Sequence, residues 1–229
     1  AALVLLGALG WSAIFDVHLG SSDAGTNPAD TTTRKAYDLI AQGFGPGANG
    51  PLLVVVENGT GSPLDQAQLA ALDKTLAGTQ GVAFTSQPIP NQQGDTAVIQ
   101  VIPLTAPQDK ATEDLIHRLR NDIIPQETQN PDLKVFIGGS PATFSDLATA
   151  PSSRLPLYIA IVAGLSILIL MTVFRSILIP IKAAFANLLS FFAGYGVMVL
   201  VFQKGVFGIN DWIGVDRTGP IESFLPIFL

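Results

Sequence analysis

The sequence predicts an α+β domain that lies outside a membrane and is joined to membrane-spanning helices. Two runs without a charged residue, Leu155–Phe174 and Ala183–Phe202, would each be about 30 Å long as helices, which matches the hydrocarbon core of a bilayer. The segment Asp16–Arg154 instead holds 15 of the 18 acids and 8 of the 12 bases, for a net charge of −7. Along this segment the spacing of apolar residues alternates between the pattern typical of strands and the pattern typical of helices. One acidic folded domain and several membrane segments account for this division.

The two apolar runs predict a helical hairpin with a basic connection. Arg175 and Lys182 are the only charged residues between Leu155 and Phe202. Cytoplasmic loops of membrane proteins are enriched in Lys and Arg, so we expect residues 175–182 in the cytoplasm and the acidic domain outside the cell. The alternative is a pair of buried helices in a soluble protein, but such helices rarely run so long without a polar face.

The acidic segment predicts a β-α-β-β-α-β unit, which is the order of a ferredoxin-like fold. A short helix precedes the unit, with Asp30 or Thr31 as its N-cap. The first helix of the unit begins at Ser62 and ends at Gly78, and Pro125 ends the second. The predicted strands are Leu52–Glu57, Gly81–Ser86, Thr96–Leu104 and Leu133–Ile137, and the predicted helices are Thr31–Gln42, Ser62–Gly78 and Gln108–Ile124.

The sequence contains few of the residue patterns that are typical of an enzyme active site, a metal site or a nucleotide site. His18 and His117 are the only histidines, neither has a partner at metal-ligand spacing, and the chain has no cysteine. Gly45, Gly47 and Gly50 match a dinucleotide fingerprint, but they follow a helix and precede a strand, whereas the fingerprint needs the reverse order. An acidic domain also disfavours nucleic acid. We therefore expect no catalytic residue, no cofactor, no metal and no nucleic-acid partner.

Several short motifs lie at the ends of the membrane segments. They are Val173-Phe174-Arg175-Ser176, Pro180-x-Lys182-Ala183, Asn187-Leu188-Leu189-Ser190, Gly138-Gly139-Ser140-Pro141-Ala142 and Pro220-Ile221-Glu222-Ser223-Phe224-x-Pro226. In order and spacing, over nearly the whole chain, they resemble the MMPL family (mycobacterial membrane protein large) of the resistance-nodulation-division (RND) superfamily of exporters. Pro141 departs from the family pattern, which usually has Thr at that position.

The resemblance implies that the chain is a slice of the second half of a multi-pass protein of the bacterial plasma membrane. In that half the α+β unit is an extracytoplasmic porter domain and the helices are part of a transmembrane bundle. The implied segments are the end of the seventh membrane helix (1–15), the porter domain (16–154), the eighth helix (155–174), a cytoplasmic turn (175–182), the ninth helix (183–203), an extracytoplasmic loop (204–219) and the start of the tenth helix (220–229).

The resemblance also implies a function, namely export of lipids or hydrophobic small molecules and drugs, driven by the proton motive force. The family's proton relay uses Asp-Tyr pairs in the fourth and tenth helices, and these positions are expected beyond Leu229. The expected partners are membrane lipids, a hydrophobic substrate, and the first half and remaining helices of the parent protein. Two alternatives stay open: a membrane-anchored extracytoplasmic binding or assembly module without transport, and a protein-translocation accessory of the same superfamily.

Two further sets of residues are candidate positions in the membrane segments. Ala186, Ser190 and Gly194 recur at i, i+4 and i+8, and small residues on one face allow helices to approach closely in lipid. Glu222 is the only acid at the predicted start of the last helix. It is interpreted either as a carboxylate that the helix dipole stabilises at an N-terminus, or as a residue at which protons enter the relay.

Overall fold

The computed structural model describes residues 19–20, 22–128, 130–208 and 221–222. The chain divides into two compact units, of which one is Ala29–Asp146 and the other combines Ala1–Pro28 with Leu147–Leu229. The first is an α+β unit and the second, a membrane unit, contains the long apolar helices. The predicted membrane segment 1–15 lies outside the described residues.

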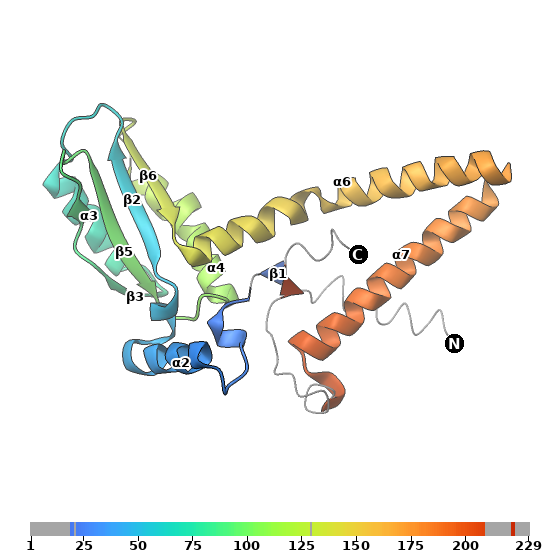
Figure 1. Cartoon of the computed structure of the whole chain (residues 1–229). Coiled ribbons are helices and arrows are strands. Elements are labelled where there is room, and N and C mark those ends of the chain that lie inside the picture. Colours follow the sequence, from blue (N-terminus) through green and yellow to red (C-terminus); the bar gives the residue numbers. More distant parts are fainter. Residues whose placement is uncertain (1–18, 21, 129, 209–220, 223–229) are drawn as a thin grey trace. The chain divides into compact units, whose positions relative to one another are not determined.

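An antiparallel sheet organises the α+β unit, with its strands in the order β3-β5-β2-β6 and with β4 also paired to β5 (Figure 1). The central strand is β2, whose Val54 lies opposite Ile99 of β5 and Ile137 of β6. The strands are β2 (Leu52–Asn58), β3 (Val82–Thr85), β4 (Ile89–Pro90), β5 (Thr96–Pro103) and β6 (Leu133–Gly138). The four predicted strands are confirmed, and β4 lies where the sequence predicts none.

Two helical segments cover one face of this sheet (Figure 1). They are α3 (Gln66–Ala77) and α4 (Lys110–Arg118), which continues through a π-helical turn, η3 (Leu119–Ile123), into α5 (Ile124–Glu127). The fully buried side chains of this layer include Leu52, Val54, Val56, Leu76, Ile99, Val101, Leu115, Ile116 and Leu119. Each such side chain stabilises the fold by about 1.5–3 kcal/mol relative to an exposed one, so this layer is the core of the unit.

Two predicted helix boundaries are wrong. The N-cap of α3 is Asp65, whose carboxylate accepts a 2.8 Å hydrogen bond from the Ala67 N–H, and not Ser62, because the Leu64 N–H is held by the Gly94 carbonyl. Pro125 does not end the second helix but lies in the first turn of α5. The π-helical turn before it changes the hydrogen-bond spacing, and proline is well tolerated at such a first position.

The helix that enters the membrane unit begins earlier than the sequence predicts. Helix α6 runs from Ser140 to Phe174, whereas the sequence predicts a start at Leu155. Arg120 fixes its first turns, because one guanidinium nitrogen donates to the Ile137 carbonyl at 2.9 Å and to Asp146 Oδ2 at 3.0 Å. The same guanidinium lowers the pKa of Asp146 below its usual value. This ion pair belongs wholly to the α+β unit.

The other described elements of the membrane unit are helix α7, two short helical segments after it and a two-stranded sheet. Helix α7 (Leu178–Met198) continues as a π-helical segment, η4 (Val199–Gln203), and a 3₁₀ turn, η5 (Val206–Gly208), follows. By length and composition Leu157–Phe174 and Leu178–Gln203 could each cross a membrane. Strand β1 (Leu19–Gly20) pairs in parallel with β7 (Ile221–Glu222).

The glycine-rich segment that resembles a dinucleotide fingerprint has a packing role. It follows helix α2 (Thr32–Phe44), which Thr31 caps by accepting from the Arg34 N–H, and it forms a 3₁₀ turn, η2 (Pro46–Asn49), before β2. A Cβ atom at Gly47 would lie 1.8 Å from the carbonyl oxygen of Pro103, so only glycine fits there. The segment opens a strand and not a helix, so it lacks the helix N-terminus that holds a pyrophosphate.

We expect Gly47→Ala to lower the free energy of unfolding by about 1–3 kcal/mol, since the added methyl group overpacks a backbone contact. Gly43→Ala is the matched control: a Cβ there meets nothing within 4 Å, and alanine in a helix is more stable than glycine by about 0.5–1 kcal/mol. Urea denaturation of the detergent-solubilised chain, followed by circular dichroism, measures both. Equal midpoints for the two variants would contradict the packing role.

Candidate functional site

The connection of the membrane hairpin is short and basic. Arg175, Ser176 and Ile177 join α6 to α7 (Figure 1). Arg175 has a φ of 47°, the left-handed conformation in which helices commonly end. Lys182 lies within α7, because Pro180 is tolerated in the first turn of a helix and does not delay its start as the predicted turn 175–182 assumed. Both cations are exposed and lie at the same end of the hairpin.

The two membrane spans contain no acidic side chain. From Leu157 to Gln203 the sequence has neither Asp nor Glu. The hydroxyl of Thr172 is satisfied within α6, where it donates to the Leu168 carbonyl at 2.9 Å. These two segments therefore supply no carboxylate that could change its charge inside a membrane.

Tyr195 is a polar position in α7 that the sequence-based prediction missed. Its side chain is only 5% exposed, and its ring stacks on Phe191 with the centroids 5.7 Å apart. Its hydroxyl has no hydrogen-bond partner among the described residues. Burying such a group unpaired costs about 1–3 kcal/mol, which makes Tyr195 a natural partner for a polar group of another helix. The available signal in the sequence is a single tyrosine in an otherwise apolar stretch.

The small-residue stripe Ala186, Ser190 and Gly194 is on the uncovered side of α7. All three residues are exposed, and a Cβ at Gly194 would meet nothing within 4 Å. The buried positions of the helix are instead Pro180, Ala193, Tyr195 and Gly196. The stripe is therefore free to receive another helix, and its role as a packing face stays a prediction.

Glu222 lies in a strand and not in the first turn of a helix. It is the second residue of β7, and its register partner in β1 is Gly20. An extended backbone provides no helix dipole, so the structure gives no support to a capping role. Residues 223–229, where the sequence predicts the start of a helix, lie outside the described residues.

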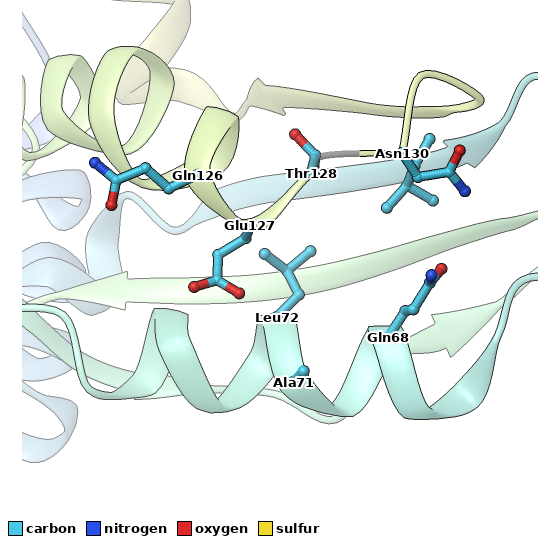
Figure 2. Close-up of a pocket in the computed structure, with 8 residues that line it drawn as sticks. Gln68, Ala71, Leu72, Gln126, Glu127, Thr128 and Asn130 are labelled. Carbon is cyan, nitrogen blue, oxygen red and sulfur yellow. The ribbon is translucent and has the colours of Figure 1, made fainter.

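The α+β unit has a surface hollow of about 330 Å³ between α3 and the connection that joins α5 to β6 (Figure 2). Gln68, Ala71 and Leu72 of α3 form one wall, and Figure 2 shows the Glu127 side chain directed toward this helix. Most of its lining side chains are exposed, and Leu72 belongs to the core. The hollow therefore has the features of an open groove with both polar and apolar lining, and not of an enclosed ligand pocket.

Within the described residues, no group of three His, Cys, Asp or Glu side chains lies close enough to hold a metal ion. His117 Nε2 lies 3.9 Å from Glu113 Oε1 on the exposed side of α4, an ordinary i, i+4 arrangement. His18 lies outside the described residues.

The chain thus joins an α+β unit to two helices that are long and apolar enough to cross a membrane, which indicates a membrane protein. The profile of the MMPL family matches residues 25–214, and the chain belongs to this family of the RND superfamily. The resemblance stated from the sequence motifs is thereby confirmed.

Three relatives show the range of proteins to which the chain is similar. Membrane protein YdfJ of Bacillus subtilis is 33% identical over 92% of the chain, and the mycolic acid-containing lipids exporter MmpL11 of Mycolicibacterium smegmatis is 28% identical over 99%. The heme uptake protein MmpL11 of Mycobacterium tuberculosis is 30% identical over 84%. The chain spans 28%, 24% and 20% of the lengths of these three proteins, respectively.

We expect Gly194→Leu to lower the yield of assembled, detergent-stable full-length protein, because the larger side chain keeps a neighbouring helix from the stripe. Ala184→Leu makes a similar change away from the stripe and should assemble normally. Size-exclusion chromatography of the two variants after membrane extraction measures the difference. Equal yields of the two variants would contradict a role of the stripe in helix packing.

Proposed function

We propose that this chain is part of a membrane exporter of lipids or hydrophobic small molecules, driven by the proton motive force. The observation that carries the proposal is the joining of a folded α+β unit to a hairpin of two apolar helices in an MMPL family chain. The name of the M. smegmatis relative, a mycolic acid-containing lipids exporter, supports a lipid as cargo. Since the relatives are several times longer, the remaining helices and the first half of the protein are the expected partners.

We infer that the α+β unit is a ferredoxin-like porter domain on the extracytoplasmic side. The order β3-β5-β2-β6, with two helical segments on one face, supports this fold. The basic end of the hairpin, with Arg175 and Lys182, supports a cytoplasmic connection in the bacterial plasma membrane. Both ends of the hairpin then emerge on the opposite side.

In this proposal the chain supplies the porter domain and part of the substrate path, and other helices of the full-length protein supply the groups that bind and release protons. Moving one charge through 100 mV is worth about 2.3 kcal/mol, but only if a group inside the membrane changes its charge. The hairpin has no such carboxylate, and Tyr195 can only donate to or accept from one. Coupling therefore requires acids from the rest of the protein.

Uptake of a hydrophobic ligand is a second candidate function. The M. tuberculosis relative, 30% identical, is named a heme uptake protein, which reverses the direction of transport. Both directions need the same apolar path. A membrane-anchored binding or assembly module without transport, or a translocation accessory, would need no proton gradient, and the transport assay below separates these alternatives from a pump.

The orientation of the hairpin is testable by cysteine labelling, because residues 1–229 contain no cysteine and any cysteine elsewhere in the full-length protein can be replaced by serine. We expect Ser176→Cys in the full-length protein to resist a membrane-impermeant maleimide applied to intact cells. The control Gln68→Cys, on exposed α3, should react, since α3 belongs to the domain proposed to lie outside. Labelling of Ser176→Cys from outside would reverse the topology.

We expect the full-length protein in proteoliposomes to move a fluorescent acyl lipid when a proton gradient is imposed, and a protonophore to abolish this flux. Gradient-independent flux would contradict proton coupling, and absence of flux would favour a module without transport. Glu222→Gln keeps the shape of the side chain and removes its charge. We expect this variant to retain the pH dependence of the flux, because Glu222 lies in a short strand; loss of that dependence would make Glu222 a residue at which protons enter.

A further inference from the structure

The basic end of the membrane hairpin has no acid nearby to balance its two cations. Between Asp146 and Asp211 the sequence contains neither Asp nor Glu. Within the described residues, neither Arg175 nor Lys182 forms an ion pair. Charged side chains in membrane segments normally pair with another group or reach the polar head groups. The counter-charge for this end of the hairpin therefore has to come from outside the described residues.

Lys182 lies inside the apolar part of α7 and not before it. The helix begins at Leu178, so Lys182 is about 6 Å further along the helix axis. Leu178 and Phe185, at positions i−4 and i+3, share its side of the helix and are 61% and 65% exposed. A lysine among apolar neighbours extends its flexible stem until the ammonium group reaches a polar layer. This position therefore suits an ammonium group at the boundary between acyl chains and head groups.

Arg175 belongs to the same end of the hairpin. It follows the last residue of α6, Phe174, and the connection to α7 has only three residues (Figure 1). The residues on either side of this connection are exposed and apolar, with Phe174 at 52% and Ile177 at 62%. A cation that is flanked by exposed apolar side chains is typical of a chain segment at a membrane interface.

We propose that Arg175 and Lys182 form a binding site for the head group of an anionic phospholipid such as phosphatidylglycerol. The planar guanidinium can donate two parallel hydrogen bonds to a phosphate, and the ammonium adds a second positive charge. Basic positions beside membrane helices are the usual binding sites for acidic head groups. The site adds a bound lipid to the proposed function and does not depend on the cargo or on the direction of transport.

The surroundings of the two cations favour a lipid over a soluble anion. A free phosphate in water would contact the cations alone, and salt screens such exposed charges within about 10 Å. A phospholipid also covers apolar surface with its acyl chains. The large apolar side chains exposed at this end of the hairpin are Phe174, Ile177, Leu178, Ile179, Ile181 and Phe185.

Photochemical labelling of the full-length protein tests the site. The protein is placed in phosphatidylcholine vesicles that contain a trace of phosphatidylglycerol or phosphatidylcholine, each with the same photoreactive group beside its head group. After illumination and digestion with pepsin, mass spectrometry measures the label on residues 174–185. We expect at least about fivefold more label from the phosphatidylglycerol probe, because each cation near a surface favours an anionic lipid by about this factor. No proton gradient is imposed, so the result does not depend on transport.

Three variants separate the charge from the fold. In the double variant Arg175→Gln, Lys182→Gln, the preference for phosphatidylglycerol should fall to about one; both side chains are exposed, so size-exclusion chromatography should show an unchanged protein. Lys182→Arg keeps the charge and should keep the preference. Lys204→Gln is the matched control, since it removes an exposed cation that follows the other end of α7, and it should leave the label on residues 174–185 unchanged.

Four outcomes would overturn the proposal. Equal label from the two probes, or an unaltered preference in the double variant, would show that the two cations do not select the lipid. Loss of the label on addition of millimolar glycerol 1-phosphate would identify a site for a soluble anion. Absence of label from both probes would show that another part of the full-length protein covers this end of the hairpin.

Discussion

The α+β unit depends on one strand, β2, which pairs with a neighbouring strand along each edge and is covered by helices on one face. Leu52, Val54 and Val56 are fully buried, and the strand pairs with β5 on one side and β6 on the other. The strand can be this apolar only because each neighbour satisfies its backbone and α3 and α4 cover its side chains. Two contacts outside β2 place the neighbouring helices. The close contact of Gly47 with Pro103 fixes the turn between α2 and β2, and Arg120 fixes where α6 begins.

Much of this architecture could be predicted from the sequence, because the periodic segments are long and their caps are local. The four main strands, the helix that Thr31 caps and the apolar runs of α6 and α7 all follow from patterns within a few residues. The family membership followed from the order and spacing of several short motifs over nearly the whole chain, and the family match confirms it. The wrong helix boundaries lie where a contact between residues far apart in the sequence determines where the helix begins. Asp65 caps α3 because Gly94 holds Leu64, and α6 begins early because Arg120 holds Asp146.

The candidate positions in the membrane unit could be predicted less well, for a physical reason. Small residues at i, i+4 and i+8 show that Ala186, Ser190 and Gly194 share a face, but not whether that face is covered. Tyr195 is a single residue without a pattern around it, and its importance comes from burial, which only a fold reveals. Glu222 was interpreted from a helix expected after it, and the strand pairing with Gly20 depends on residues about two hundred positions away.

Exposed apolar side chains have different consequences in the two units. Exposed Ile161, Leu165 and Leu168 on α6 fit a lipid environment, because apolar side chains facing hydrocarbon need no further cover. Exposed Leu39 and Phe44 on α2 and Phe136 on β6 belong to a unit whose net negative charge is typical of a water-exposed domain. Apolar patches of this kind on a water-exposed domain mark interaction sites. The exposed apolar side chains of α6 therefore fit their expected surroundings, whereas those of the α+β unit indicate a surface that contacts a partner.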